Sequence, residues 1–318
     1  MQISPIPTLS EEINDIRLRT ADIVANRIIP NEATIYAGGD KSKKLRKEIN
    51  EEVKKQGLWA PHLPTEYGGM DNGFLELAYM NEILAWSPLG NRLFGVIAPN
   101  SGNQKILVKY GTDEQKKKWL IPLINQEMES GFSMTEPDSA GSDPRSLKTT
   151  AVKDGDEWVI NGHKIMTSNG NRADFLVVMC RTEGDDDEGG ANSKMTQIIV
   201  PTDSPGLTKV RSVPIWGHTG GDHMEIKYEN VRVPLENALG ARGSGHQAAQ
   251  DRLGAGRVYH CMNTIGQMWR AFDIMVKYST ERDVHGGKLE TKQFIQGFIA
   301  DSYMAVSYTH LRAHETGY

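Results

Sequence analysis

The chain has 318 residues, 38% of them hydrophobic, so it is long enough for two domains of ordinary size with sizeable cores. Its 36 lysines and arginines against 41 aspartates and glutamates give a net charge of -5, which removes the simplest electrostatic reason to expect a nucleic-acid partner. Residues 1–10 lack a basic start followed by an apolar run, and no stretch approaches about 18 consecutive apolar residues. We therefore expect no membrane span and a cytoplasmic location.

The cysteines and histidines lack the spacing of a metal site. Cys180 and Cys261 lie far apart in apolar surroundings, so we expect two buried free thiols rather than zinc ligands. Four histidines lie near glycine-containing segments, and their spacing matches no ligand motif. They are His218, His223, His246 and His260. The sequence therefore predicts no bound metal.

Residues 8–125 are predicted to form an α-helical N-terminal domain. Thr8 and Glu11 have the spacing of a capping box. The charged run Lys43–Gln56 predicts an exposed helix that ends at Gly57. Apolar residues at roughly helical spacing follow the first cap, namely Ile13, Ile16, Ile23 and Val24.

Two further signals mark helix starts in this domain. Two prolines and a glycine pair within residues 61–69 interrupt any regular structure, so we expect the helix to resume near Phe74. Thr112 and Gln115 have the spacing of a second capping box, with acidic residues between them and lysines just beyond. This second box predicts a further helix start at residue 112.

Residues 126–240 are predicted to form a central all-β domain, either a barrel or a sandwich. Short β-type runs are separated here by Gly, Asp and Asn. Asn161-Gly162 predicts a turn, and the acidic, glycine-rich insertion 183–190 predicts a solvated hairpin tip rather than a metal site. The clearest strands are Glu157–Ile160, Phe175–Met179, Gln197–Val200 and Met224–Tyr228.

Helical patterning returns at Gln247, so residues 241–305 are predicted to begin a C-terminal helical bundle. The apolar period of this segment stops near residue 306, and residues 306–318 are interpreted as a non-native tail outside the fold. The predicted class is therefore α+β multidomain, with an N-terminal helical domain, a central β domain and the start of a helical bundle. A stripe on one helix face predicts core packing rather than cofactor binding: Met262, Ile265, Met268 and Trp269.

One polar segment has the residue types that a flavin site needs. A protein that binds FAD must cover the ring, offer neutral hydrogen-bond donors to its edge and neutralise a pyrophosphate. Gly141 and Ser142 would let a phosphate approach the backbone, while Met134 and Thr135 could present an amide and a hydroxyl to the ring. An ordinary turn after a strand is the alternative interpretation of the same residues.

Two sequence blocks resemble the flavin-binding signature of the acyl-CoA dehydrogenase family. The first is Phe132–Pro137 followed by a Gly-Ser-Asp loop at 141–143, and the second is Trp158–Lys164 followed by Met166–Gly170. In the family the second block lays a side chain on the flavin and offers a hydroxyl to N5. The resemblance implies FAD contacts at Phe132, Met134, Thr135, Gly141, Ser142, Met166, Thr167 and Ser168, with Ser142 also near the substrate.

Other segments extend the resemblance over residues 8–305. Leu63–Gly69 and Tyr110–Lys116 are similar to early family motifs. The segment that ends at Arg257 resembles the one whose last arginine lies near the thioester and coenzyme A. Glu281–Gln293 resembles the stretch that reaches the FAD of a neighbouring subunit, which implies that Arg282 approaches its pyrophosphate and that Gln293 is also a cofactor residue.

Two departures from the family pattern affect the flavin loops. Three residues, Asp138 to Ala140, stand between Pro137 and Gly141, one more than in the commonest form, so the phosphate donors could shift by one position. Met166 stands where the family often has tryptophan, which gives a softer and less rigid cover for the flavin.

The family's catalytic base has no counterpart in this sequence. The glutamate usually lies in a last helical segment, which would follow residue 305, and a minority form has it at the position of Gly256. Asp251, Glu225 and Glu229 are interpreted as surface or structural carboxylates. We therefore name no catalytic residue and expect the 318-residue chain to be almost inactive, whereas the parent protein is expected to be active.

The resemblance implies FAD-dependent α,β-dehydrogenation of an acyl-CoA to the trans-2-enoyl-CoA, with electrons passed to an electron-transfer flavoprotein. It also implies a homodimer or homotetramer and an acyl chain that enters near Val96–Gln104. Three alternatives stay open: a flavin monooxygenase or acyl-CoA oxidase on the same fold, a DNA-binding relative of alkylation defence, and a fragment without a role of its own. Acyl length, branching and the natural electron acceptor are not predicted.

Overall fold

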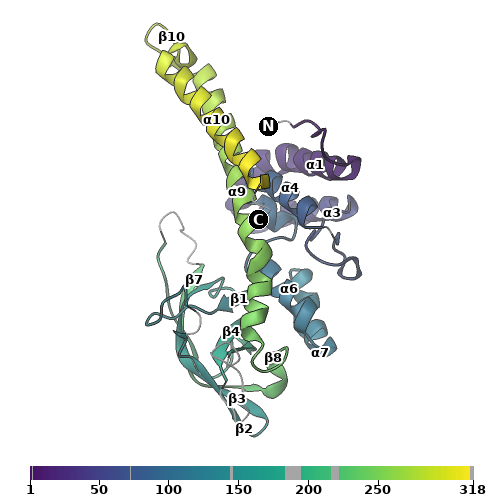
Figure 1. The fold of residues 1–318 in the computed structure, drawn as a ribbon, viewed down its shortest axis with the longest axis vertical. Coiled ribbons are helices and arrows are strands. Elements are labelled where there is room, and N and C mark those ends of the chain that lie inside the picture. Colours follow the sequence, from purple (N-terminus) through teal and green to yellow (C-terminus); the bar gives the residue numbers. More distant parts are fainter. Residues whose placement is uncertain (2, 72, 144–145, 183–194, 216–221, 316–318) are drawn as a thin grey trace. The chain divides into compact units, whose positions relative to one another are not determined.

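The computed structural model describes residues 1, 3–71, 73–143, 146–182, 195–215 and 222–315 (Figure 1). The chain divides into two compact units, one formed by Met1–Val96 with Ala255–Tyr318 and the other by Ile97–Gly254. The domain boundaries at 125/126, 240/241 and 305/306 stay predictions, because the compact units follow packing rather than chain order.

The N-terminal part of the first unit is helical. Its helices are α1 (Glu11–Ile23), α2 (Glu32–Tyr36), α3 (Gly39–Lys55), α4 (Phe74–Leu84) and α5 (Gly90–Leu93). The helix predicted to end at Gly57 is confirmed, since α3 stops at Lys55 and Gly57 has a left-handed φ of 67°. The resumption near Phe74 is also confirmed.

The predicted Thr8/Glu11 capping box is wrong. Ser10 caps α1 instead, because its extended backbone lets its Oγ accept a hydrogen bond from the Ile13 amide at 3.2 Å. The apolar pattern after the cap is confirmed, because all four residues are buried: Ile13, Ile16, Ile23 and Val24.

The C-terminal part of the first unit contains two long helices. Helix α9 spans Gly245–Glu281, of which the residues from 255 onward belong to this unit, and α10 spans Gln293–Glu315. The short hairpin β9 (Asp283–Val284) and β10 (Gly287–Lys288) joins them. Helix α10 continues through residue 306, so the change of apolar period there does not end the helix as the pattern suggested. The foreign origin of residues 306–318 stays a prediction.

Three of the four predicted stripe residues on α9 form core packing, whereas Met268 is half-buried outside that cluster. Met262 and Ile265 are buried against Ala78 of α4, and Trp269 packs partly buried on the same cluster. Gly266 lies at the closest approach of the two helices, because a Cβ built there would meet the Glu82 carbonyl oxygen at 1.9 Å.

The helices of the second unit pack on its sheet. They are α6 (Asn100–Tyr110), α7 (Asp113–Gln115) and α8 (Ile121–Ile124). The predicted capping box is confirmed, with both reciprocal bonds present between Thr112 and Gln115. The Gln115 amide also donates to the carbonyl oxygens of Glu236 and Ala238 at 2.7 and 2.9 Å, which fixes this helix start against the end of the sheet.

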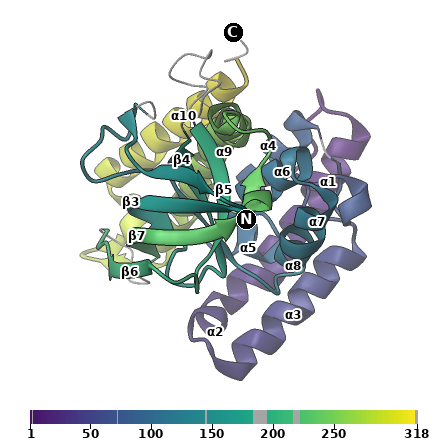
Figure 2. The same ribbon diagram turned by 90° about the horizontal axis from the view of Figure 1, so that it is seen from below.

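The strands of the second unit form one eight-stranded sheet, of which β3 to β7 are labelled in Figure 2. The strand order is β6-β7-β3-β1-β4-β5-β8, and β2 pairs with both β3 and β4. Short strand β1 runs parallel to β4, whereas it runs antiparallel to β3. The bounds are Ser130–Ser133 (β1), Thr150–Asp154 (β2), Glu157–Ser168 (β3), Phe175–Arg181 (β4), Met195–Pro201 (β5), Leu207–Ser212 (β6), His223–Pro234 (β7) and Ala238–Leu239 (β8).

All four predicted strands are confirmed, but the predicted turn at Asn161-Gly162 is wrong. These residues lie inside β3, where the pairing with β7 shifts register between Ile160 and Gly162. A Cβ at Gly162 would lie 2.3 Å from the Thr149 hydroxyl oxygen. The glycine therefore serves a close approach within β3 rather than a turn, and the extra residue of the register shift lies on β7.

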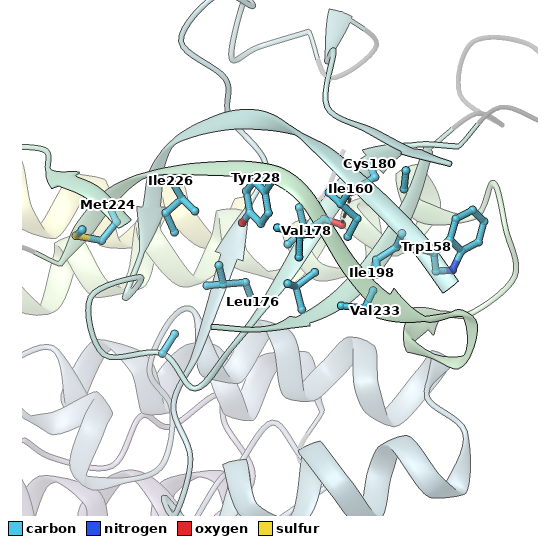
Figure 3. Close-up of a cluster of buried hydrophobic side chains, with 14 residues drawn as sticks. Trp158, Ile160, Leu176, Val178, Cys180, Ile198, Met224, Ile226, Tyr228 and Val233 are labelled. Carbon is cyan, nitrogen blue, oxygen red and sulfur yellow. Dashed lines mark hydrogen bonds between the residues drawn. The ribbon is translucent and has the colours of Figure 1, made fainter. Parts of the chain in front are cut away.

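The sheet is buried on both faces of β4. Leu176, Val178 and Cys180 join side chains of β3, β5 and β7 in the cluster shown in Figure 3. On the other face, Phe175 packs against Trp119 with ring centroids 4.9 Å apart. Cys180 is buried as predicted, whereas Cys261 is exposed, because its position on α9 lies outside the Met262 and Ile265 stripe.

Two features are absent from the residues that the structure describes. No helix in this part of the chain is long and apolar enough to cross a membrane. No group of three or more His, Cys, Asp or Glu side chains has the geometry to hold a metal ion within the same residues. The predicted hairpin tip 183–190 and His218 lie outside them.

Candidate functional site

A strained bulge near the end of β3 presents Met166 to solvent. The register between β3 and β7 shifts between Lys164 and Thr167, and Met166 within the shift has a left-handed φ of 59°. Its side chain is 41% exposed. A left-handed conformation costs an L-residue about 1–2 kcal/mol, and such strain clusters at ligand sites. The bulge thus presents an apolar side chain at the position expected to cover a flavin.

The two residues after Met166 point their hydroxyls to different environments. Thr167 is fully buried, and its hydroxyl shares a 2.9 Å hydrogen bond with Ser133. Tyr228 donates to the same serine at 3.0 Å, and burial raises the pKa of Tyr228, which keeps it neutral. Ser168 is only half-buried and lies 3.1 Å from Nδ1 of His223. Of the two hydroxyls, that of Ser168 is therefore better placed for a ligand.

A buried ion pair fixes the loop that follows β1. The Lys164 ammonium is fully buried and lies 2.9 Å from the Glu136 carboxylate. It also donates to the Met134 carbonyl oxygen at 2.8 Å. The Ile165 amide donates to the Thr135 carbonyl oxygen at 2.9 Å. The first flavin-type block is thereby tied directly to the strand that carries the second.

The remaining lone pairs of Glu136 are also satisfied. Its carboxylate accepts the Lys148 and Thr149 amides at 2.7 and 2.8 Å and the Thr149 hydroxyl at 2.6 Å. Burial by itself would raise the pKa of Glu136, but Lys164 and these hydrogen bonds lower it to about 2. Burial lowers the pKa of Lys164, and the carboxylate opposes that shift. Glu136 is therefore ionised at neutral pH and acts as a structural anchor.

The other residues predicted for the first block lie along the same loop. Met134 is half-buried and packs against the cluster formed by Leu147, Met179, Met195 and Ala249. Thr135 is half-buried, while Gly141 and Ser142 are exposed. Phe132 of β1 is half-buried beneath the Arg252 guanidinium. The structure therefore brings all eight predicted contacts of the two blocks into one compact unit.

Three predicted residues belong to the other unit. Arg257 is exposed on α9, Arg282 is exposed where α9 meets the β9–β10 hairpin, and Gln293 is exposed at the start of α10. Their roles toward cofactor and substrate stay predictions, because an implied contact with a neighbouring subunit involves a second copy of the chain.

Two of the carboxylates considered as bases are held in ion pairs. Asp251 lies 2.6 Å from Lys109 and also accepts a short hydrogen bond from Tyr110, and these bonds lower its pKa. Glu225 lies 2.8 Å from His163 and 2.6 Å from Arg211, which likewise lower its pKa. Glu229 is exposed. The ion pairs keep Asp251 and Glu225 ionised and structural.

The residues that position the site were not predicted from the sequence. Lys164 and Glu136 were identified only as members of the two sequence blocks. No role was predicted for Ser133, Tyr228 or His223. A signal for Lys164 was present, because it shares the strand parity of the inward-facing Trp158 and Ile160. A lysine at such a position calls for a buried partner.

The fold and the two linked blocks are those of a flavoprotein dehydrogenase family. The acyl-CoA dehydrogenase N-terminal domain matches residues 10–127, the middle domain matches 131–231 and the C-terminal domain matches 243–316. This chain belongs to the acyl-CoA dehydrogenase family.

Individual relatives agree with that membership. FadE2 of Mycobacterium tuberculosis, named a probable acyl-CoA dehydrogenase, is 38% identical over 92% of this chain and 74% of its own length. Acyl-CoA dehydrogenase family member 10 of Mus musculus is 36% identical over 84% of this chain, which spans only 26% of that longer protein.

Solved structures have the same fold. The acyl-CoA dehydrogenase of Geobacillus kaustophilus gives a TM-score of 0.77 at 25% identity, over 97% of this chain and 79% of that one. A glutaryl-CoA dehydrogenase of Mycobacterium smegmatis, solved in complex with FADH2, gives 0.74 at 25% identity, over 96% and 75%.

Replacing Met166 with glycine is expected to stabilise the protein and weaken flavin binding. Glycine relieves the left-handed strain, a gain of about 1 kcal/mol, but removes the apolar cover, so we expect FAD to bind roughly tenfold more weakly, or about 1.4 kcal/mol. Met166→Ala is the matched control, because it loses the cover and keeps the strain. Thermal unfolding and FAD titration measure the two effects. A Met166→Gly variant that is less stable than the wild type would contradict the strain argument.

Proposed function

We propose that this chain binds FAD and forms part of an enzyme that oxidises an acyl-CoA thioester to the trans-2-enoyl-CoA. The observation that carries the proposal is the Met166 bulge beside an anchored polar loop on the sheet matched by the family's middle domain. The site supplies neutral hydroxyls and an apolar cover rather than metal ligands, which suits a flavin ring. The relative solved with FADH2 supports the same cofactor.

The proposed roles follow the geometry of the second unit. Met166 covers the ring, and the half-buried Ser168 hydroxyl binds N5 in preference to the buried Thr167. Met134 and Thr135 bind the ring edge, with Phe132 behind them. Exposed Gly141 and Ser142 bind the pyrophosphate through backbone N–H groups, and Ser142 also approaches the substrate.

Residues of the other unit complete the proposal. Arg282 and Gln293 reach the FAD of a neighbouring subunit in a homodimer or homotetramer, and Arg257 approaches the thioester. When bound, FAD accepts the hydride that leaves the β-carbon, and the electrons pass to an electron-transfer flavoprotein. The protein works in the cytoplasm, or in the mitochondrial matrix if the source is eukaryotic.

The reaction also needs a base for the α-proton. Asp251 and Glu225 are occupied in ion pairs, so neither is assigned this role. The base is proposed to lie outside the described residues, and the 318-residue chain is then expected to bind flavin while turning over very slowly, since a positioned base contributes roughly 10²–10⁴-fold.

Anaerobic flavin reduction tests the proposal. The full-length protein is purified with FAD and mixed with acyl-CoAs of several lengths in the absence of oxygen. Rapid bleaching with slow reoxidation in air supports a dehydrogenase, whereas rapid reoxidation indicates an oxidase or monooxygenase. A colourless protein without FAD affinity contradicts the proposal, and DNA binding in a gel shift at physiological salt would point to the alkylation-defence alternative.

Ser168→Ala tests the assignment of the N5 hydroxyl. Loss of one neutral hydrogen bond that strengthens during reduction is expected to slow bleaching about tenfold, or 1.4 kcal/mol. Ser204→Ala, at a half-buried position in the link between β5 and β6 of the same unit, is the control, and it is expected to leave the rate unchanged. Equal rates for Ser168→Ala and the wild type would contradict the assignment.

A further inference from the structure

The Arg252 guanidinium lies between β1 and α6 within the second unit. Its Cζ lies 4.0 Å from the centroid of the Phe132 ring. Its Nε donates to the Asn103 amide oxygen at 3.3 Å. The backbone of α6 approaches closely, because a Cβ built at Gly102 would lie 2.7 Å from the same nitrogen. The planar group is thus stacked on one side and confined on another.

This guanidinium lacks an anionic partner in the described part of the chain. Its interactions there are the Asn103 hydrogen bond and the Phe132 ring. Arg270, which is also half-buried, instead pairs with the Glu32 carboxylate at 3.4 Å. Burial lowers the pKa of Arg252 to about 10, so the group stays charged at neutral pH. A half-buried charge with most of its five N–H donors unused is suited to bind an anion.

The position of Arg252 identifies which anion it meets. Phe132 belongs to the proposed flavin-binding block, whereas Gly102 and Asn103 belong to the segment near which the acyl chain is expected to enter. The flavin pyrophosphate already has proposed partners in Gly141, Ser142 and Arg282. The Arg252 guanidinium lies between the Phe132 ring and the α6 segment that contains Asn103. A planar guanidinium matches a carboxylate, because it can bind it with two parallel hydrogen bonds.

We propose that Arg252 determines specificity by binding a carboxylate on the acyl chain, so that the preferred substrates are monothioesters of dicarboxylic acids. The inference rests on the proposed function and names the substrate class of that site. Arg252 binds and orients the distal end of the chain and takes no part in proton or hydride transfer.

Binding of matched thioester pairs tests the proposal. Dissociation constants are measured by calorimetry on the FAD-loaded full-length protein for glutaryl-CoA against pentanoyl-CoA and for adipyl-CoA against hexanoyl-CoA. The wild type is expected to bind at least one carboxylate-bearing member tenfold or more tightly than its neutral partner. Arg252→Gln is expected to lose that preference, and Arg252→Lys to keep part of it. Lys105→Gln, an exposed charge change on α6, is expected to keep all of it.

The outcomes separate this inference from the proposed function. A wild type that prefers the neutral partner in both pairs, or an Arg252→Gln variant with an unchanged preference, overturns the inference even if acyl-CoAs bleach the flavin. An Arg252→Gln variant that loses FAD while its preference persists also overturns it, because the arginine is then a cofactor anchor. Preserved preference in the wild type without any flavin reduction contradicts the proposed function but supports Arg252 as the carboxylate site.

Discussion

Replacing Lys164 with methionine is expected to lower the free energy of unfolding by about 3–5 kcal/mol, because it leaves a buried carboxylate without its counter-charge. The lysine side chain is fully buried and Glu136 nearly so. Methionine fills a similar volume, so the change tests charge rather than shape. Urea or thermal unfolding of the purified protein measures the effect. FAD affinity is expected to fall as well, since Lys164 also donates to the Met134 carbonyl oxygen of the loop proposed to bind flavin.

Two controls distinguish the buried pair from a general charge effect. Arg232→Met removes an exposed arginine that pairs with Asp154 and Glu157 on the same sheet, and we expect it to leave the unfolding midpoint nearly unchanged. The double variant Glu136→Met/Lys164→Met is expected to be more stable than Lys164→Met alone, because no unpaired charge remains. If Lys164→Met and Arg232→Met lower the free energy of unfolding by the same amount, the buried pair contributes no more to stability than the exposed one.

The same pair gives stability a defined pH dependence. The folded pKa of Glu136 is about 2 against an ordinary value of 4.5, so the unfolded chain binds more protons between these values. Stability therefore rises with pH in this window, is fully present above about pH 5 and is lost as pH falls toward 2. The Glu136→Met/Lys164→Met variant is expected to lack this component of the acid transition.

Local signals were sufficient for most elements of the fold. The Thr112 cap and the end of α3 depend on residues a few positions apart, so the sequence predicts both. Strand β4 is a continuous apolar run, and this composition predicts a strand that is buried on both faces, as the structure has it. The turn predicted at Asn161-Gly162 does not form, because the pairing of β3 with β7 and the contact with Thr149 override the local turn preference.

The candidate site was predictable only in part, because its support is non-local. The loops with Met134, Gly141 and Met166 were identified by resemblance, and the structure places them in one unit. The lysine partner of Glu136 lies 28 residues along the chain, and Arg252 reaches Asn103 across 149 residues. No local pattern encodes such pairs. They depend on strand register and on how α9 starts beside α6.

Helix packing in the first unit depends on Gly266. Its built Cβ would meet the Glu82 carbonyl oxygen at 1.9 Å and the Ala85 side chain at 2.9 Å. Backbone cannot yield as a flexible side chain can, so Gly266→Ala must separate α9 from α4 and loosen the Met262 and Ile265 packing. We expect a loss of about 3 kcal/mol, and hence an unfolding midpoint several degrees lower.

The matched control for this prediction is Gly297→Ala on α10. A Cβ at Gly297 meets nothing within 4 Å, so alanine there gains helix propensity of up to about 1 kcal/mol without a clash. The two substitutions are chemically identical and both lie inside long helices, so opposite signs in thermal unfolding isolate the helix contact. A Gly266→Ala protein as stable as the wild type would mean that α9 and α4 do not approach as closely as the structure places them, and that the stripe of Met262 and Ile265 packs by another route.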